Sequence, residues 1–205
     1  MNSRKMKVLF DANVILTFLT RREDKYLKEI DAIMQQCHNK TLEGFVAFHS
    51  LSIIWYLLRK VPYNDRVDSM VIICDALKVA YAENAMILHA LENTGFIDFE
   101  DNLQDCCAQN VHADYIVTAN VHDYEGHSVV KAVTPAEFLS ILEASNADES
   151  TEVHEAPAYY ELAPISARHY LTQKKRNTAK THIHRLFSKG QHLLMASCII
   201  ENTAT

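Results

Sequence analysis

Apolar residues recur along the chain in short runs, and each run is followed by a segment with helical spacing. The run at 7–10 ends at Asp11, and apolar positions 14, 15, 18 and 19 then repeat with the helical period. The same alternation continues to residue 143, with strands expected at 44–49, 76–81, 114–118 and 129–133, and helices expected at 25–38, 51–60, 65–76, 86–91, 100–109 and from Pro135. Strands that alternate with helices predict an α/β fold, a three-layer α/β/α sandwich with a central parallel sheet of four to five strands.

Two helix starts carry recognisable capping residues. Ser50 is expected to cap the helix over 51–60. Thr134 and Glu137 flank Pro135 in the order of a capping box, which predicts the start of the last helix.

The pattern fades after Glu143, and this divides the chain into two parts. Residues 1–143 are expected to form one domain. Residues 144–155 are small, polar and acidic, which is typical of a linker. The remainder of 144–205 is expected to be a poorly structured extension, disordered or helical, with a basic segment at 168–189 that contains seven Lys and Arg residues and no acid.

Composition bounds the class of protein. With 48% hydrophobic and 22% charged residues in 205, the chain is typical of a soluble globular protein. The sequence shows no signal peptide and no apolar run of about 18 residues, so we expect no membrane association. The five cysteines are odd in number and lack metal-site spacing, which favours reduced thiols and a cytoplasmic location.

The net charge of −6 is unevenly distributed. Residues 1–143 carry 13 Lys and Arg against 20 Asp and Glu, whereas residues 144–205 carry 7 against 6. An acidic domain suits a polyanionic ligand poorly unless its acids are gathered to hold cations. The position of the acids therefore matters more than their number.

Three acids are expected at one edge of the predicted sheet. Asp11 ends the first strand, Asp101 lies in the first turn of the helix at 100–109, and Asp123 follows the strand at 114–118 after a short loop. Ligands of open parallel sheets bind beyond the carboxyl ends of the strands. Converging carboxylates repel one another, and Mg²⁺ or Mn²⁺ with all-oxygen ligation would offset that repulsion.

Each acid also has a simpler structural interpretation. Asp11 alone could cap the helix that follows it, Asp101 could interact with the helix dipole, and Asp123 could be an ordinary loop acid. The metal-site hypothesis depends on the three acids together.

Four segments, in order, resemble the motifs of PIN domains. They are Val-Leu-Phe-Asp-Ala-Asn-Val-Ile-Leu (8–16), Phe-Glu-Asp-Asn-Leu-Gln-Asp-Cys-Cys-Ala (99–108), Ala-Asp-Tyr-Ile-Val-Thr-Ala-Asn-Val-His-Asp-Tyr (113–124) and Val-Thr-Pro-Ala-Glu-Phe-Leu (133–139). The resemblance is closest to VapC-like toxins of type II toxin–antitoxin pairs. It implies a Rossmann-like fold, divalent-metal-dependent cleavage of RNA, a homodimer and inhibition by a cognate antitoxin.

The resemblance also assigns residues. Asp11, Asp101 and Asp123 would be the catalytic, metal-binding acids, and Asn13, Thr118 and Asn120 would support them through hydrogen bonds. The second motif of the family places an acid in the helix after the second strand, where this sequence has Ile53. Asp105, one helical turn from Asp101, is a candidate replacement ligand.

Two interpretations therefore remain open. The first is an endoribonuclease toxin, and the second is a catalytically weakened PIN module that binds RNA or a protein, which Ile53 favours. A response-receiver domain fits less well, because Asp11-Ala12-Asn13 stands where that class would have a second acid. The pairs Arg21-Arg22 and Arg59-Lys60 and the Lys-Lys-Arg at 174–176 are candidate phosphate contacts.

Overall fold

A five-stranded, wholly parallel sheet forms the centre of the molecule in a computed structural model, which describes residues 4–149. The strand order is β3-β2-β1-β4-β5. The strands are β1 (Lys7–Phe10), β2 (Glu43–Ala47), β3 (Lys78–Ala80), β4 (Tyr115–Val117) and β5 (Ala132–Val133). Fold class and strand number agree with the sequence prediction.

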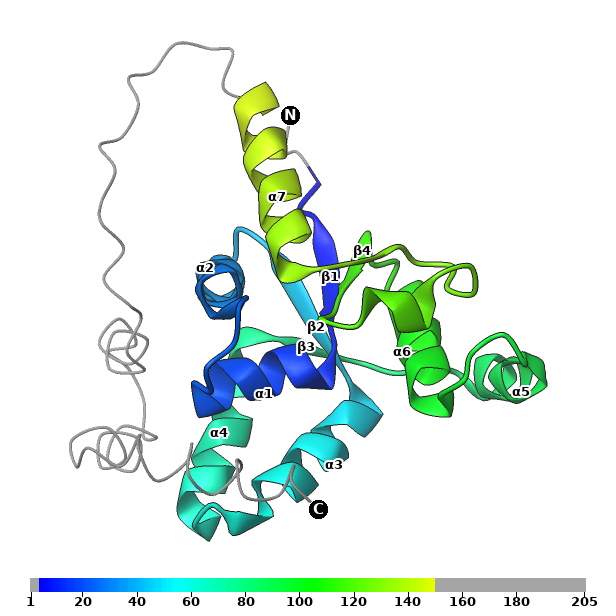
Figure 1. The fold of residues 1–205 in the computed structure, drawn as a ribbon, viewed down its shortest axis with the longest axis horizontal. Coiled ribbons are helices and arrows are strands. Elements are labelled where there is room, and N and C mark those ends of the chain that lie inside the picture. Colours follow the sequence, from blue (N-terminus) through cyan, green and yellow to red (C-terminus); the bar gives the residue numbers. More distant parts are fainter. Residues whose placement is uncertain (1–3, 150–205) are drawn as a thin grey trace.

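Helices cover both faces of this sheet (Figure 1). The α-helices are α1 (Ala12–Thr20), α2 (Leu27–His38), α3 (Phe48–Leu57), α4 (Tyr63–Ala76), α5 (Asn84–Glu92), α6 (Phe99–Asn110) and α7 (Pro135–Glu149). Two 3-10 turns complete the described elements, η1 (Leu58–Lys60) and η2 (Val121–Tyr124). None of the helices in this part of the chain is long and apolar enough to cross a membrane.

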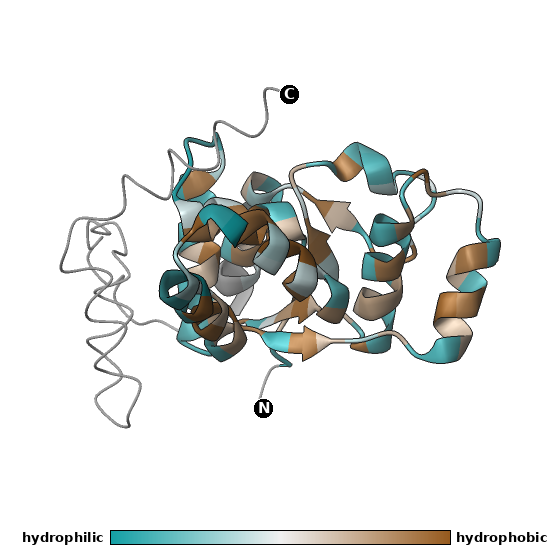
Figure 2. Ribbon diagram, turned by 90° about the horizontal axis from the view of Figure 1, so that it is seen from below, coloured by the Kyte–Doolittle hydropathy of each residue, from teal (hydrophilic) through white to brown (hydrophobic). Residues whose placement is uncertain are grey.

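Alternation along each strand divides the interior into two cores. Val8 and Phe10 of β1 pack with α1, α2, α4 and α7 on one face. Leu9 points to the other face, where it joins a smaller core that contains Cys107 of α6. Figure 2 shows the strands largely in the hydrophobic colour between the flanking helices. Burial on both faces explains why β1 is a continuous apolar run.

Gly44 lets β2 lie close to the helices that cover it. A Cβ atom there would be 2.6 Å from Leu77 Cδ2 and 2.7 Å from Cys37 Sγ. These separations are shorter than any van der Waals contact, so the packing at this point requires glycine.

Two details of the sequence prediction were wrong. Ser50 does not cap a helix, because β2 ends at Ala47 and α3 begins directly at Phe48, which places Ser50 inside the first turn. The last strand was expected over 129–133 but contains only Ala132 and Val133. The backbone amides of Val129 and Val130 donate to the Asp105 carboxylate instead of to a strand.

The end of the described region agrees in part with expectation. The Thr134 hydroxyl and amide both pair with Glu137 Oε2, and Glu137 N–H donates to Thr134 Oγ1, so the predicted capping box is confirmed. Helix α7 continues to Glu149, beyond the linker start expected at residue 144. The basic segment at 168–189 and most of the expected extension lie outside the described residues.

Candidate active site

Asp11 lies at the carboxyl end of β1, in the middle of the sheet. Its backbone N–H donates to Val117 O, and its side chain accepts from Asn13 N–H at the start of α1. The residue is only 5% exposed. Thr118 Oγ1 donates to one carboxylate oxygen at 2.8 Å and Gln104 Nε2 to the other at 3.2 Å. Asp11 is therefore both a helix cap and an acid held in a fixed orientation.

The predicted supporting residues contribute in different ways. Thr118 is buried at the end of β4, where it bonds directly to Asp11 and accepts from Asn120 N–H at 3.0 Å. The hydrogen bonds of Asn13 and Asn120 to this group are made by backbone amides. Both asparagine residues are exposed, so their side chains lie at the surface of the site.

Asp101 lies in the first turn of α6, which is capped by the Asp98 side chain. The Tyr124 hydroxyl donates to Asp101 Oδ1 at 3.0 Å and so fixes one oxygen. The pKa of Asp101 is raised to about 6, chiefly by burial and further by the charges of Asp11, Asp98 and Asp123, while the Tyr124 hydrogen bond lowers it. Asp11 and Asp123 are therefore near enough to Asp101 for their charges to act on it.

Glu100 is a further acid of this group that the sequence analysis missed. Burial, together with repulsion from Asp11, Asp98 and Asp101, raises its pKa to about 7. Its position directly before Asp101 in the third motif was the available signal, but adjacent helical residues point in different directions. Only the structure shows that Glu100 faces Asp11 closely enough to be perturbed by it.

The other predicted positions lie further from this centre. Asp123 is exposed in η2, and its charge is the weakest of those that raise the pKa of Asp101. Ile53 is half-buried on α3, which starts beside the group. At that start, burial lowers the pKa of the His49 ring, and the Glu100 backbone beside the ring opposes this shift.

Asp105 is committed to a structural role. Its Oδ1 accepts from Ser128 Oγ at 2.6 Å and from Val130 N–H at 2.9 Å, and its Oδ2 accepts from Val129 N–H at 3.1 Å and from Gln109 Nε2 at 2.8 Å. The residue is 2% exposed. With both oxygens occupied by protein donors, Asp105 anchors the segment that leads to β5, and we leave it out of the candidate metal site.

The donor set has the chemistry that a hard cation requires. Asp11, Glu100 and Asp101 supply carboxylate oxygens whose mutual repulsion a divalent ion would offset. Within residues 4–149, no three His, Cys, Asp or Glu side chains are placed so that they could hold a metal ion together. Mg²⁺ is usually bound by one or two carboxylates, with water and substrate phosphates completing its shell. The residues fit that mode of binding, in which the protein alone does not enclose the ion.

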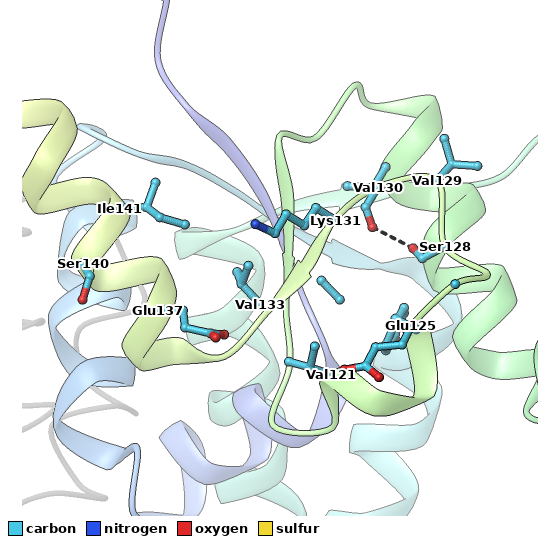
Figure 3. A pocket seen from close by; sticks show the side chains of 13 residues that line it. Val121, Glu125, Ser128, Val129, Val130, Lys131, Val133, Glu137, Ser140 and Ile141 are labelled. Carbon is cyan, nitrogen blue, oxygen red and sulfur yellow. Dashed lines mark hydrogen bonds between the residues drawn. The ribbon is translucent and has the colours of Figure 1, made fainter.

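A separate hollow of about 730 Å³ lies between η2, β5 and α7 (Figure 3). Val121, Val133 and Ile141 supply much of its apolar lining, and Glu125, Lys131 and Glu137 are among its polar residues. None of the acids described above lines it. The candidate active site is therefore the acidic edge of the sheet and not this hollow.

The fold and the acidic edge together define a class, that of α/β/α domains whose acids gather at the carboxyl ends of parallel strands. A family model described as PIN domain matches residues 7–122, which is more than half of the chain. The chain belongs to the PIN domain family. PIN domains are in general nucleases that typically use divalent metals. A comparison with curated proteins found no match.

Proposed function

We propose that this protein is a divalent-metal-dependent endoribonuclease that hydrolyses RNA phosphodiester bonds at the edge formed by Asp11, Glu100, Asp101 and Asp123. The observation that supports this most strongly is the orientation of Asp11. A solvated helix cap would not need Thr118 and Gln104 to hold both of its oxygens inside the protein.

The side chains at this edge have different proposed roles. Asp11 and Asp101 are the proposed metal ligands, Asp11 oriented by Thr118 and Gln104, and Asp101 oriented by Tyr124. Glu100 adds the negative charge that Ile53 does not supply. A divalent cation bound there would polarise a phosphoryl oxygen and help to form hydroxide for in-line attack.

Metal titration tests the site independently of catalysis. We expect wild-type protein to bind Mn²⁺ by isothermal titration calorimetry and to cleave RNA only when metal is present. Loss of an outer partner alone commonly weakens metal affinity 10–100-fold, so Asp11→Asn and Asp101→Asn should each weaken it by at least about tenfold. Asp114→Asn is the matched control, because Asp114 directly precedes β4, where its carboxylate binds Arg4 and the Lys7 N–H and not the candidate site. Equal affinity in all four proteins would refute the site.

The second candidate is a catalytically weakened PIN module that binds RNA or another protein. Ile53 at the acidic position of the second motif favours it. RNA binding by the wild type without any cleavage, even with Mn²⁺ bound, would select this candidate.

The biological role that we propose is that of a toxin in a toxin–antitoxin pair, acting as a homodimer in the cytoplasm and neutralised by a cognate antitoxin. This rests on the likeness of the four motifs to VapC-like toxins. Induced expression in a bacterial host should arrest growth, expression of Asp101→Asn should not, and co-expression of the product of a neighbouring small gene should restore growth. Light scattering on the purified protein tests the dimer.

A further inference from the structure

A group of aromatic and basic side chains, most of them exposed and two half-buried, lies on α3, η1 and α4, outside the acidic edge. We call it the α3–α4 surface, and it consists of Phe48, Trp55, Tyr56, Arg59, Tyr63 and Arg66. Phe48, Tyr56 and Tyr63 are 69%, 61% and 66% exposed. Aromatic side chains so exposed contribute little to the core and mark a binding surface when they lie together.

The rings are held in place by guanidinium groups. Arg59 Cζ lies 4.3 Å from the Tyr56 ring centre, and Arg66 Cζ lies 3.9 Å from that of Trp55. Trp55 and Tyr63 meet edge to face, with ring centres 5.8 Å apart. Cation–π contacts of this kind orient the rings while leaving the outer faces of the two tyrosines accessible.

Two cations of this surface, Arg59 and Lys60, are exposed to a negatively charged ligand, and Arg66 is half-buried. Arg21 forms a bidentate ion pair with Asp31. In contrast, neither Arg59 nor Arg66 forms an ion pair with any residue in 4–149. Lys60 follows Arg59 and is also exposed. In a chain of net charge −6, a group of unpaired cations beside exposed rings favours an anionic ligand with flat, stackable groups.

The surface leads toward the candidate active site. Phe48 and Tyr56 are eight residues apart on α3, so they lie on the same face of the helix and about 12 Å apart along its axis. Phe48 is at the start of α3, where the neighbouring His49 ring lies beside the Glu100 backbone. At about 3.4 Å per stacked nucleotide, the distance from Phe48 to Tyr56 corresponds to roughly four nucleotides.

We propose that the α3–α4 surface binds the single-stranded RNA substrate beside the cleavage site, with bases stacked on Tyr56 and Tyr63 and phosphates bound by Arg59 and Arg66. This rests on the proposed function, because it takes RNA as the substrate. Stacked bases must be unpaired, so the surface selects single-stranded over duplex RNA.

The test measures binding without cleavage. The anisotropy of a labelled 12-nucleotide RNA is followed in EDTA with the full-length protein, once as a single strand and once annealed to its complement. The double variant Tyr56→Ala/Tyr63→Ala removes both stacking rings, so single-strand binding should weaken at least about tenfold. Tyr56→Phe/Tyr63→Phe keeps the rings and should stay within about twofold. The basic segment at 168–189 is present in every variant, so the difference reports on the rings.

Two further variants keep the result interpretable. Leu88→Ala removes an apolar side chain that is 55% exposed on α5, across the sheet from α4 (Figure 1), and should leave the Kd unchanged. If the double alanine variant fails to fold, Arg59→Gln tests the same surface, because losing one phosphate contact lowers the slope of log K against log salt by about one.

The outcomes separate this inference from the proposed function. Loss of binding in the alanine variant with no cleavage by wild type, even in Mn²⁺, would uphold the RNA surface and refute the nuclease. Cleavage by wild type with equal RNA affinity in the alanine and phenylalanine variants would refute the surface as an RNA site and leave it as a protein contact. Equal affinity for single strand and duplex would also refute it.

Discussion

Replacing Asp105 by Asn should destabilise the protein strongly, although the substitution changes only one atom. The carboxylate accepts four hydrogen bonds in a site that is 2% exposed. An Asn side chain would keep its oxygen toward Ser128 and Val130 and turn its amide toward Gln109, whose own amide can rotate to accept. Val129 N–H would then face another donor and lose its partner.

The size of the effect follows from these contacts. A hydrogen bond to a charged group contributes about 1.5–3 kcal/mol, and a neutral one about 1 kcal/mol. Losing one charged bond and weakening two others gives a loss of about 3 kcal/mol in the free energy of unfolding. In a chain of this size, each 1 kcal/mol shifts the melting temperature by about 2–4 °C, so we expect a drop of roughly 6–12 °C.

Thermal unfolding followed by circular dichroism in EDTA measures this drop. Asp123→Asn is the matched control, because Asp123 is exposed and a surface substitution usually changes stability by less than about 0.5 kcal/mol. A shift below about 2 °C for Asp105→Asn, together with weaker Mn²⁺ binding, would refute the structural role and return Asp105 to the metal site.

Three other changes test the site and the packing around it. Glu100→Gln should raise the melting temperature of the metal-free protein at pH 7.5 but hardly at pH 5. Because the pKa of Glu100 is raised, the folded state binds more protons than the unfolded state between about pH 4 and 7. The wild type therefore loses about 1 kcal/mol of stability, after solvent screening, as the pH rises through that window. An equal gain in melting temperature at both pH values would contradict this. Gly44→Ala should cost about 1–3 kcal/mol in urea unfolding, because the added methyl group overlaps Leu77 and Cys37, and an unchanged midpoint would contradict it. Ile53→Glu should strengthen Mn²⁺ binding in calorimetry if residue 53 faces the acids, whereas unchanged affinity with lost stability would mean that the second motif is aligned wrongly.

The repeated pattern of strand and helix made the architecture predictable. The run Val8-Leu9-Phe10 is apolar at every position, which is the signature of a strand buried on both faces, and the helices that alternate with such strands imply a parallel sheet. The capping box at Thr134 was equally predictable, because its hydrogen bonds join residues close together in the sequence. Features that depend on neighbours in sequence were therefore within reach.

Contacts between distant segments could not be predicted from the sequence. Asp105 and Val130 are 25 residues apart, and nothing in the local pattern around 129–133 shows that a carboxylate will take the amides of an expected strand. Glu100 was missed for a related reason, since its importance comes from Asp11, which is far away in sequence. Asp11 could be placed because the end of a strand fixes where its side chain lies.

The diversion of Val129 and Val130 to Asp105 also affects how the protein behaves at high concentration. It limits β5 to two residues at one edge of the sheet, while β3 at the other edge has three. An edge strand exposes unpaired amides and carbonyls on which another chain can add a strand, and short edges reduce that template. The anchor at Asp105 thus protects the sheet from edge-to-edge aggregation, so variants that release it should form intermolecular β-structure more readily than their loss of stability alone would produce.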